Sequence, residues 1–401
     1  MAFTKFILPA LAIASTVLAQ TSTSVCDGPS ITIASSADAS QIASCSTYSG
    51  DVVIDSSAAG QIAIDGVQQI KGDLTCNNAT QLTAITSDQL GTITGTFSLT
   101  GLTILSTLQF NSLNAVDVIN WVGLPALQSL NFNQGVSEAN EVYISNTELN
   151  NVDGIELTAV GTLNINNNPY LTDVNVNDLA NVTSSLSFSA NGKDLQISFP
   201  NLQDAANLTF INVSSVDMPS LATVGGSMGF YSDTIESFAA PNLTTTGGTL
   251  AFVDCGSLSN LSFPSLTEIG GGFLLANNSD LKAISGFPKL KTVVGAIDFA
   301  GTFGSVALPS LTDVRGGSNV QTTSTNTTIC DLFNEAHSAG VIKGVNTCIT
   351  DKADPDTNAS STGGGSSSTA TSTSSSKSDG VTFYPSTLTG LGAFLAAIFF
   401  I

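Results

Sequence analysis

The residues that could do chemistry are few in this chain, and its carboxylates come first. The sequence has 31 Asp and Glu but a single histidine, His337. Two carboxylates suffice for glycoside hydrolysis, and Asp254 and Asp298 lie near predicted strands, one or two repeats from Asp233. With so many acids this proximity is expected by chance, and no aromatic cluster accompanies them, since Trp121 is the sole tryptophan. We therefore predict no catalytic residue and no enzyme activity.

Other kinds of site need residue types that the chain lacks. His337 beside Glu335 favours a place in a capping helix over a Ser-His-Asp triad, and no G-x-S-x-G motif is present. A metal site needs more histidine or closely spaced cysteines, so we expect no metal and no other cofactor. With 10 Lys and Arg and a net charge of −21, the chain is too acidic to neutralise a row of phosphates, which excludes nucleic acid as a partner.

The commonest motif with a chemical meaning is the N-x-S/T acceptor for N-linked sugar. It occurs at Asn78, Asn181, Asn207, Asn212, Asn242, Asn260, Asn277, Asn326 and Asn358. Because 42% of residues are apolar and only 10% are charged, attached sugars would supply the solubility that side-chain charge does not. Asn212 and Asn277 fall directly after predicted strands, where they should face solvent. We expect most of these acceptors to be glycosylated.

These residues are carried by a repeat of about 20–24 residues, seen most clearly over 250–293. Each copy has L-x-F or F-x-L, then leucines, then F-P-x-L-x-x-I/V, then glycines. The return-leg prolines disfavour a helix, and the abundance of Val, Thr, Ile and Phe favours strands on both legs. These prolines are Pro200, Pro219, Pro241, Pro264, Pro288 and Pro309. The pattern predicts a mainly β solenoid over residues 20–350.

Two positions within the repeat have predicted roles. The position after each strand holds asparagine or cysteine, as at Asn168, Asn191, Cys255 and Asn278, and its side chain should point inward and bond neighbouring backbone. The glycine pairs should form tight corners that need positive φ. They are Gly225–Gly226, Gly247–Gly248, Gly270–Gly272 and Gly316–Gly317.

The N-terminus reads as a secretory leader over residues 1–19. Lys5 gives the basic start, residues 6–17 form the apolar core, and cleavage is predicted after Ala19. A membrane anchor is the competing interpretation, but the apolar run is too short for one. The leader directs the chain to an oxidising compartment, where cysteines pair by default.

The cysteines divide into terminal pairs that would close two caps and two single residues. The predicted disulfides are Cys26–Cys45 and Cys330–Cys348, with Cys45–Cys76 as an alternative at the first cap. A helical turn within 38–44 and a helix containing Leu332, Phe333 and Ala336 should complete the caps. Cys76 and Cys255 are about eight turns, or about 40 Å, apart, which is too far for a bond. We predict that both are unpaired buried thiols.

The C-terminal part changes in composition. Residues 351–378 are rich in Ser and Thr and poor in apolar residues, which is typical of an O-glycosylated stalk, with an uncoated linker as the alternative. Residues 379–401 combine a spacer with a final apolar run that is shorter than the about 20 residues of a spanning helix. They predict a GPI-anchor signal that is removed, with attachment at Ser378 and with Gly380 and Asp379 as alternatives. A tail-anchored helix is the competing interpretation.

The repeat resembles the receptor L-domain, the leucine-rich module of insulin- and EGF-receptor ectodomains. More specifically, the whole chain is similar to the fungal GPI-anchored cell-wall organisation glycoproteins of the extracellular-mutant and sporulation-specific group. The resemblance rests on the leader, the Cys26 cap, the F-P-x-L and G-G-x-L repeats, the Cys330 and Cys348 end, the stalk and the anchor signal. It implies a right-handed parallel β-helix, a location at the plasma membrane and cell wall, and a role in wall integrity and morphogenesis.

The leading hypothesis is a non-enzymatic surface glycoprotein that organises the wall by binding wall polysaccharide or wall mannoproteins, held to the membrane by its GPI lipid. A ligand-binding or adhesive receptor-like ectodomain is the second hypothesis. A wall-glycan hydrolase or transferase is the third, and Asp254 and Asp298 are its candidate residues.

Overall fold

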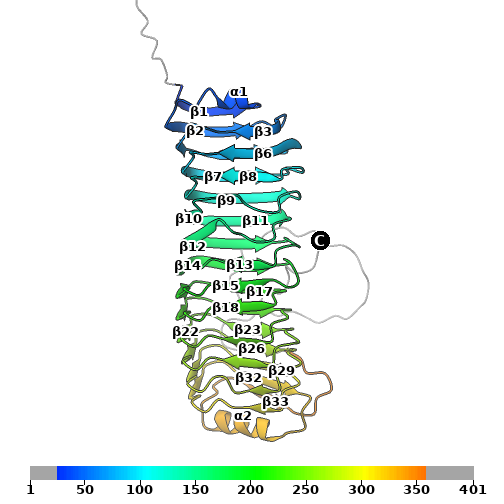
Figure 1. Ribbon diagram of the computed structural model, residues 1–401. Helices are drawn as coiled ribbons and strands as arrows, with labels where there is room; N and C mark the ends of the chain where they lie inside the picture. Colours follow the sequence, from blue (N-terminus) through cyan, green and yellow to red (C-terminus); the bar gives the residue numbers. More distant parts are fainter. Residues whose placement is uncertain (1–24, 358–401) are drawn as a thin grey trace, which may run out of the picture. The chain divides into compact units, whose positions relative to one another are not determined.

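The computed structural model describes residues 25–357, which form a parallel β-solenoid of about 13 turns. Figure 1 shows its strands stacked as rungs from β1 (Asp27–Ile33) to β33 (Asn346–Ile349), with a helix at each end. The predicted mainly β solenoid is confirmed. Neither helix within 25–357 has the length and apolarity that crossing a bilayer requires.

Each turn places one strand in a long parallel sheet, and we call these the front strands. Neighbouring front strands pair residue for residue, as Leu250 with Phe273 and Phe252 with Leu275. The front strands after β1 are β2 (Thr47–Ile54), β5 (Leu74–Asn77), β7 (Thr92–Thr100), β9 (Ala115–Leu124), β11 (Glu141–Thr147), β12 (Ile155–Asn166), β14 (Asn181–Ser189), β17 (Leu208–Ile211), β20 (Met228–Tyr231), β23 (Leu250–Val253), β26 (Phe273–Ala276), β29 (Ile297–Gly301), β32 (Ser318–Thr322) and β33.

Two further sets of strands complete the turns. In the later turns a short strand precedes each front strand. In some earlier turns the short strand and the front strand form one continuous bent strand, such as β7, whose register with β9 shifts between Ile93 and Thr96. The short strands are β4 (Gln69–Lys71), β10 (Val136–Glu138), β16 (Asp204–Ala205), β19 (Thr223–Val224), β22 (Thr245–Thr246), β25 (Glu268–Ile269), β28 (Thr292–Val293) and β31 (Asp313–Val314). The return strands are β3 (Ala59–Ala63), β6 (Gln81–Ser87), β8 (Thr107–Phe110), β13 (Asp173–Asn175), β15 (Gln196–Ser198), β18 (Ser215–Asp217), β21 (Ser237–Ala239), β24 (Asn260–Ser262), β27 (Ala283–Ile284) and β30 (Ser305–Val306).

The core is built from the alternate residues of each strand, which point inward. Phe188, Phe210, Phe230 and Phe252 occupy the same inward position in four successive turns, and their consecutive ring centroids lie 6.3, 4.9 and 4.6 Å apart. Each is buried, and burial of such a side chain contributes about 1.5–3 kcal/mol. Because the contact repeats at every turn, the stability of the solenoid is largely a sum over neighbouring turns.

The predicted role of the glycine pairs is wrong. Positive φ is adopted instead by the residue that follows a front strand, as at Asn212, Asp254 and Asn277, and Asn and Asp tolerate this conformation better than most side chains. The pairs are glycine because successive turns approach closely there. A Cβ on Gly247 would lie 1.9 Å from the carbonyl oxygen of Gly225 in the preceding turn.

Both predicted disulfides are confirmed, and each closes one end of the solenoid. Cys26–Cys45 lies beside α1 (Ser36–Ala39), which begins two residues earlier than the predicted turn because Ser35 caps it by accepting the N–H of Asp38. The alternative Cys45–Cys76 pairing is therefore wrong.

At the other end, the Cys330–Cys348 disulfide joins α2 (Thr328–Ser338) to β33. The predicted capping helix is present, but its buried residues are Ile329 and Phe333. Leu332, which was expected in the core, is 36% exposed because it lies on the outer side of the helix. Phe333 continues the aromatic core, with its ring 6.2 Å from that of Phe299.

Candidate functional site

The three candidate carboxylates lie on different parts of the solenoid. Asp233 is buried in the interior, and Asp254 lies at an exposed corner after β23, where it accepts a hydrogen bond from Asn277 Nδ2 at 3.0 Å. Asp298 projects from the outer side of β29. The structure therefore does not bring them to one surface. Over residues 25–357, no group of three or more His, Cys, Asp or Glu is placed to hold a metal.

Asp233 belongs to a ladder of inward side chains, one per turn, at the position directly after the positive-φ corner residue. The ladder comprises Thr147, Asn168, Asn191, Val213, Asp233, Cys255 and Asn278. Asn278 shows its pattern: Oδ1 accepts the N–H of Cys255 at 2.9 Å, and Nδ2 donates to the carbonyl of Phe252 at 2.9 Å. Asn191 repeats it, since Oδ1 accepts the N–H of Asn168 and Nδ2 donates to the carbonyl of Ile165. The predicted inward, backbone-bonding role of this position is confirmed.

Asp233 completes only half of this pattern. Its Oδ1 accepts the N–H of Val213 at 2.6 Å, while its buried Oδ2 has no hydrogen-bond partner within the described residues. In the equivalent place Asn278 donates to the carbonyl of Phe252, and an ionised carboxylate has no donor to offer there. Burial raises the pKa of Asp233 to about 7, although hydrogen bonds from the Val213 and Tyr231 backbone act to lower it. The protonated carboxyl is the form that fits this position.

Cys76 and Cys255 are free and buried in the structure. Burial raises the pKa of each thiol to about 12. Cys255 Sγ lies 3.7 Å from the carbonyl oxygen of Phe230, where the ladder asparagines place their amide donor. Because the thiolate is the reactive form of cysteine, both residues are packing groups and not nucleophiles.

The sugar acceptors lie on the outside of the solenoid. The side chains of Asn78, Asn181, Asn207, Asn212, Asn242, Asn260, Asn277 and Asn326 are all exposed. Three of them, Asn78, Asn212 and Asn277, occupy the positive-φ corner after a front strand. Asn358, the leader 1–19 and the proposed attachment residues Ser378, Asp379 and Gly380 lie outside the described residues.

Two in-register rows of uncharged residues run along the outer side of the front strands from β5 to β14, and we call them the polar strip; the exposed Glu141 of β11 lies beside these rows. Its residues alternate with core residues and pair in register from strand to strand, and all of them except Ser145, which is 2% exposed, are exposed or half-buried. The polar strip consists of Thr75, Asn77, Ser98, Thr100, Asn120, Val122, Tyr143, Ser145, Asn164, Asn166, Ser187 and Ser189. Six strands spaced about 4.8 Å apart give it a length of about 24 Å.

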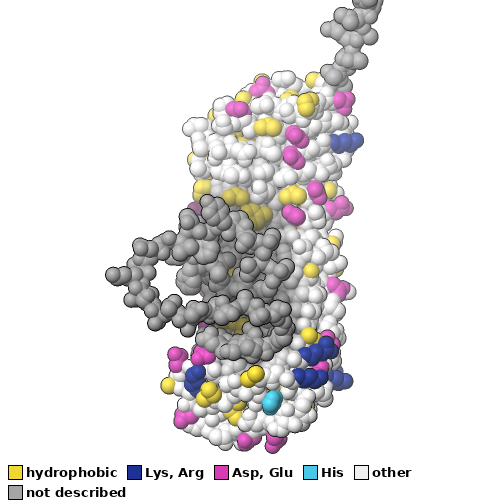
Figure 2. Space-filling view, turned by 180° about the vertical axis from the view of Figure 1, so that it is seen from behind, with side chains coloured by type: hydrophobic (Ala, Val, Ile, Leu, Met, Phe, Trp, Pro, Cys, Tyr) yellow, Lys and Arg dark blue, Asp and Glu magenta, His cyan; other side chains and the backbone are white. Residues whose placement is uncertain are grey.

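The polar strip differs from the rest of the surface in two respects. It has no charged residue in a chain with 31 acidic and 10 basic residues, and none of its asparagines lies in an N-x-S/T motif. Figure 2, seen from behind, shows acidic side chains scattered along the solenoid, and most of the visible Lys and Arg toward the end that carries α2. The polar strip thus lacks both charge and sites for attached sugar.

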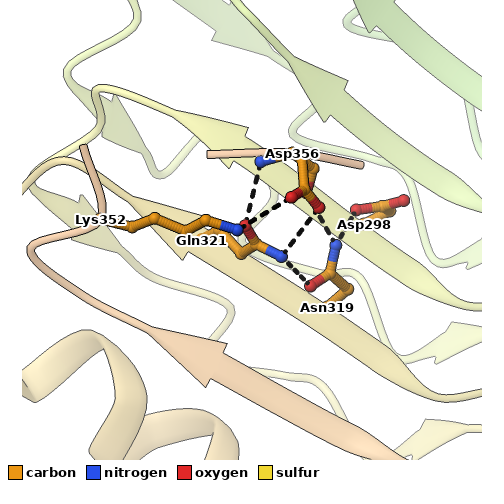
Figure 3. A network of polar contacts seen from close by, with 5 residues as sticks. All are labelled: Asp298, Asn319, Gln321, Lys352 and Asp356. Carbon is orange, nitrogen blue, oxygen red and sulfur yellow. Dashed lines mark hydrogen bonds and ion pairs between the residues drawn. The ribbon is translucent and has the colours of Figure 1, made fainter. Parts of the chain in front are cut away.

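Beyond the polar strip the front face becomes apolar, and its last strands are covered by the chain itself. Residues 352–356 fold back over the outer side of β32 (Figure 3). Gln321 accepts the N–H of Asp356 at 3.0 Å and donates to its Oδ1 at 3.2 Å, while Lys352 Nζ lies 2.9 Å from Asp356 Oδ2. Lys352 and Asp356 therefore contact the solenoid, although they fall within the range predicted to be the stalk.

Asp298 lies beside this fold-back and accepts a hydrogen bond from Asn319 Nδ2 at 2.8 Å. Burial raises its pKa to about 6, and the nearby carboxylate of Asp356 adds to the rise. The acid is thus held in a network that closes the end of the solenoid, which gives it a structural role.

An open groove of about 400 Å³ adjoins the polar strip, at the N-terminal ends of β7, β9 and β12. It contains Asp117 and Glu138 but none of the predicted candidates. Sequence reasoning missed the polar strip because Ser, Thr and Asn are abundant everywhere in the chain. The aligned repeats did contain a signal for the polar strip. In six consecutive turns, the outward residue between the two inward core residues of the front strand is uncharged.

The chain is similar to known fungal surface proteins over most of its length. A family model described as "Ecm33: GPI-anchored cell wall organization protein" matches residues 1–43. "Protein ecm33" of Aspergillus fumigatus is 43% identical over 362 residues, covering 90% of this chain and 89% of the relative. "Cell surface GPI-anchored protein ECM33" of Candida albicans is 31% identical, covering 90% and 87%. "Cell wall protein ecm33" of Schizosaccharomyces pombe is 31% identical, covering 86% and 80%.

No solved structure matches the chain. The names of these relatives describe cell-surface and cell-wall proteins, and none of the three names a reaction. The similarity covers 86–90% of the chain and is therefore not confined to the leader. The chain therefore belongs to the Ecm33 family of GPI-anchored cell wall organisation proteins.

Proposed function

We propose that the protein organises the fungal wall as a non-enzymatic scaffold that binds neutral wall polysaccharide along its polar strip. Its family gives the broader role, since these are GPI-anchored cell-surface proteins of the plasma membrane and cell wall. The single observation that carries the finer proposal is a continuous row of hydroxyl and amide side chains without charge or sugar acceptors, in a chain with a net charge of −21.

The chemistry of the polar strip favours polysaccharide over a protein partner. The centre of a protein–protein interface is usually apolar and rich in aromatic residues, whereas Val122 and Tyr143 are the only large apolar side chains on the polar strip. Hydroxyl and amide groups both donate and accept hydrogen bonds, as sugar hydroxyls do. A surface that repeats at every turn also suits a linear polymer that repeats at every sugar unit.

The remaining parts of the chain support a scaffold held at the cell surface. The GPI lipid would attach the chain to the membrane, and the Ser/Thr-rich stalk predicted over 351–378 would hold the solenoid away from it. Sugars on the exposed acceptors would keep the other faces soluble. Disulfides at both ends resist fraying in an oxidising environment. No step of this role requires a catalytic group.

The test is to express the full chain in a secretory fungal host, purify it in detergent, and measure binding to β-1,3-glucan, β-1,6-glucan, chitin and mannan. Polymer length is followed in the same samples. We expect saturable binding to at least one polymer with no change in its length. Shortened or rearranged polymer would establish a hydrolase or transferase instead. Binding only to a wall mannoprotein, with every protein-free polymer unbound, would establish the receptor-like alternative.

A further inference from the structure

The most distinctive residue of the polar strip is Tyr143 on β11. It is the only aromatic residue on the polar strip and is 36% exposed. The pairing of β11 with its neighbours places it directly opposite Asn120 of β9 on one side and Asn164 of β12 on the other. An aromatic ring is therefore flanked by an amide on each neighbouring rung.

The two flanking amides are fixed in position and retain hydrogen-bonding capacity. Asn120 Nδ2 donates to Ser98 Oγ at 3.4 Å, and Asn164 Oδ1 accepts from Asn166 Nδ2 at 2.8 Å. Within residues 25–357, no hydrogen bond uses the Tyr143 hydroxyl, Asn120 Oδ1 or Asn164 Nδ2. Asn120 Oδ1 thus remains available as an acceptor on one neighbouring strand, and Asn164 Nδ2 as a donor on the other.

The other tyrosine on the outer side of the front strands is arranged differently. A Cβ on Gly229 would lie 2.5 Å from Cε2 of Tyr231, so the Tyr231 ring lies flat across the glycine two residues before it. Burial correspondingly raises the pKa of Tyr231. Tyr143 has Glu141 at that position, and β11 has no glycine over which its ring could fold.

We propose that Tyr143, Asn120 and Asn164 form a binding subsite for one sugar unit of a neutral, β-linked polysaccharide. This rests on the proposed function above. A pyranose with all-equatorial substituents has a flat apolar C–H face, which stacks on the Tyr143 ring, and hydroxyls at its edges, which reach Asn120 Oδ1 and Asn164 Nδ2. Tyrosine is suited to such an anchor, since it offers a large contact area with little side-chain entropy to lose.

This geometry selects among wall polymers. β-Linked glucan and chitin share the all-equatorial sugar face and both fit the subsite. In mannose the 2-hydroxyl is axial and breaks the apolar face, so mannan fits poorly. The exposed Glu141, two residues before Tyr143 on the same side of β11, also disfavours acidic sugars, because like charges repel.

The matched control is Tyr170, a second exposed tyrosine. It is 56% exposed and lies after β12, off the polar strip. Three variants, Tyr143→Ala, Tyr143→Phe and Tyr170→Ala, are compared with the unaltered full chain in binding to soluble fragments of β-1,3-glucan, chitin and mannan. The thermal unfolding temperature of each variant confirms folding, which substitution of an exposed side chain should leave intact.

We expect Tyr143→Ala to weaken binding to β-linked fragments by about tenfold or more, while Tyr143→Phe keeps the stacking contact and loses less. Tyr170→Ala should bind like the unaltered chain. If the unaltered chain binds and Tyr143→Ala binds equally well, the subsite is wrong but the proposed function stands. If mannan is preferred over both β-linked polymers, the subsite is also overturned. If the unaltered chain binds no polysaccharide, the proposed function falls and the subsite with it.

Discussion

The backbone N–H of Val213 donates to Oδ1 of Asp233 at 2.6 Å, in the place where the N–H of Cys255 donates to Oδ1 of Asn278. The two acceptors are equivalent members of the inward ladder, but asparagine carries a donor on its second atom and an ionised aspartate does not. The buried Oδ2 of Asp233 therefore offers a donor only when it carries a proton. One turn of the solenoid thus depends on the protonation state of a buried acid.

This relationship predicts that the protein is more stable in acid than at neutral pH. Asp233 has an ordinary pKa of 3.8 in the unfolded chain and a pKa of about 7 when folded. Below pH 3.8 both states are protonated and there is no penalty. Between these values the unfolded state loses its proton first, so the free energy of unfolding falls as the pH rises. At about 1.4 kcal/mol per pKa unit the loss approaches about 4 kcal/mol above pH 7.

Asp233→Asn restores the ladder pattern and should remove this dependence, with the largest gain in stability at neutral pH. The titratable group packed against Asp233 is the Cys255 thiol, which stays neutral because burial raises its pKa to about 12. Denaturant unfolding of both proteins from pH 4 to 8 measures the effect, with exposed Asp254→Asn as the control. Equal slopes for Asp233→Asn and the unaltered chain would show that Asp233 is not the responsible group.

The close approach of turns at the glycine pairs gives a second prediction, with a matched pair of variants one turn apart. Gly247→Ala would bring its Cβ to 1.9 Å from the Gly225 carbonyl oxygen, whereas Gly225→Ala meets nothing nearer than Ala206 Cα at 3.8 Å. We expect Gly247→Ala to cost about 2–4 kcal/mol of unfolding free energy, and Gly225→Ala to cost much less. Similar costs for both variants would indicate that backbone conformation, and not the approach of the turns, requires glycine.

The glycines also mark the limit of what the sequence predicts. Periodicity identified both β legs and the inward ladder, and the positions of the terminal cysteines identified the two disulfides, because each of these features depends on residue types that lie close together in the sequence. The distance between turns is a property of the folded stack, so the reason for glycine at Gly247 was not accessible from the repeat. The same holds for the fold-back of Lys352 and Asp356 onto Gln321, since three polar residues so far apart carry no local signal. That the polar strip is uncharged can be recognised only when the strand register is known, because its residues are far apart in the sequence.

The fold-back predicts a local effect on the end of the solenoid. Gln321→Ala removes the side chain that bonds Asp356 and Lys352, and the loss of these bonds should lower stability by about 1–3 kcal/mol. Amide hydrogen exchange should become faster at residues 350–357 and stay unchanged in β5 to β14. Thr347→Ala, at an exposed position on β33, is the control. Protection that is retained at 350–357 would show that the fold-back is held by other contacts.

The burial of the two free cysteines gives a further prediction. With a pKa of about 12 and no exposed surface, the thiols of Cys76 and Cys255 should resist iodoacetamide in the native protein and react after unfolding. Mass spectrometry should then find two alkylated cysteines, and four more only after reduction. Any native alkylation at Cys255 would mean that this turn opens readily, which would also expose Asp233 to solvent.

The sugar acceptors predict a pattern of occupancy that also bears on the polar strip. Asn78, Asn212 and Asn277 lie exposed at corners after front strands and should carry sugar, and enzymatic release in water labelled with heavy oxygen would mark each site by incorporating that oxygen into the new aspartate. Replacing these three residues by glutamine should reduce solubility but leave polysaccharide binding intact, because the polar strip lies on the strands and not at the corners.

Since the positive φ suits asparagine better than glutamine, the triple variant should also lose some stability. Asn→Asp at the same sites removes the sugar while keeping the backbone preference, and it separates the two effects. Loss of binding in the Asn→Asp variant would place the attached sugars, and not the polar strip, at the contact with the wall.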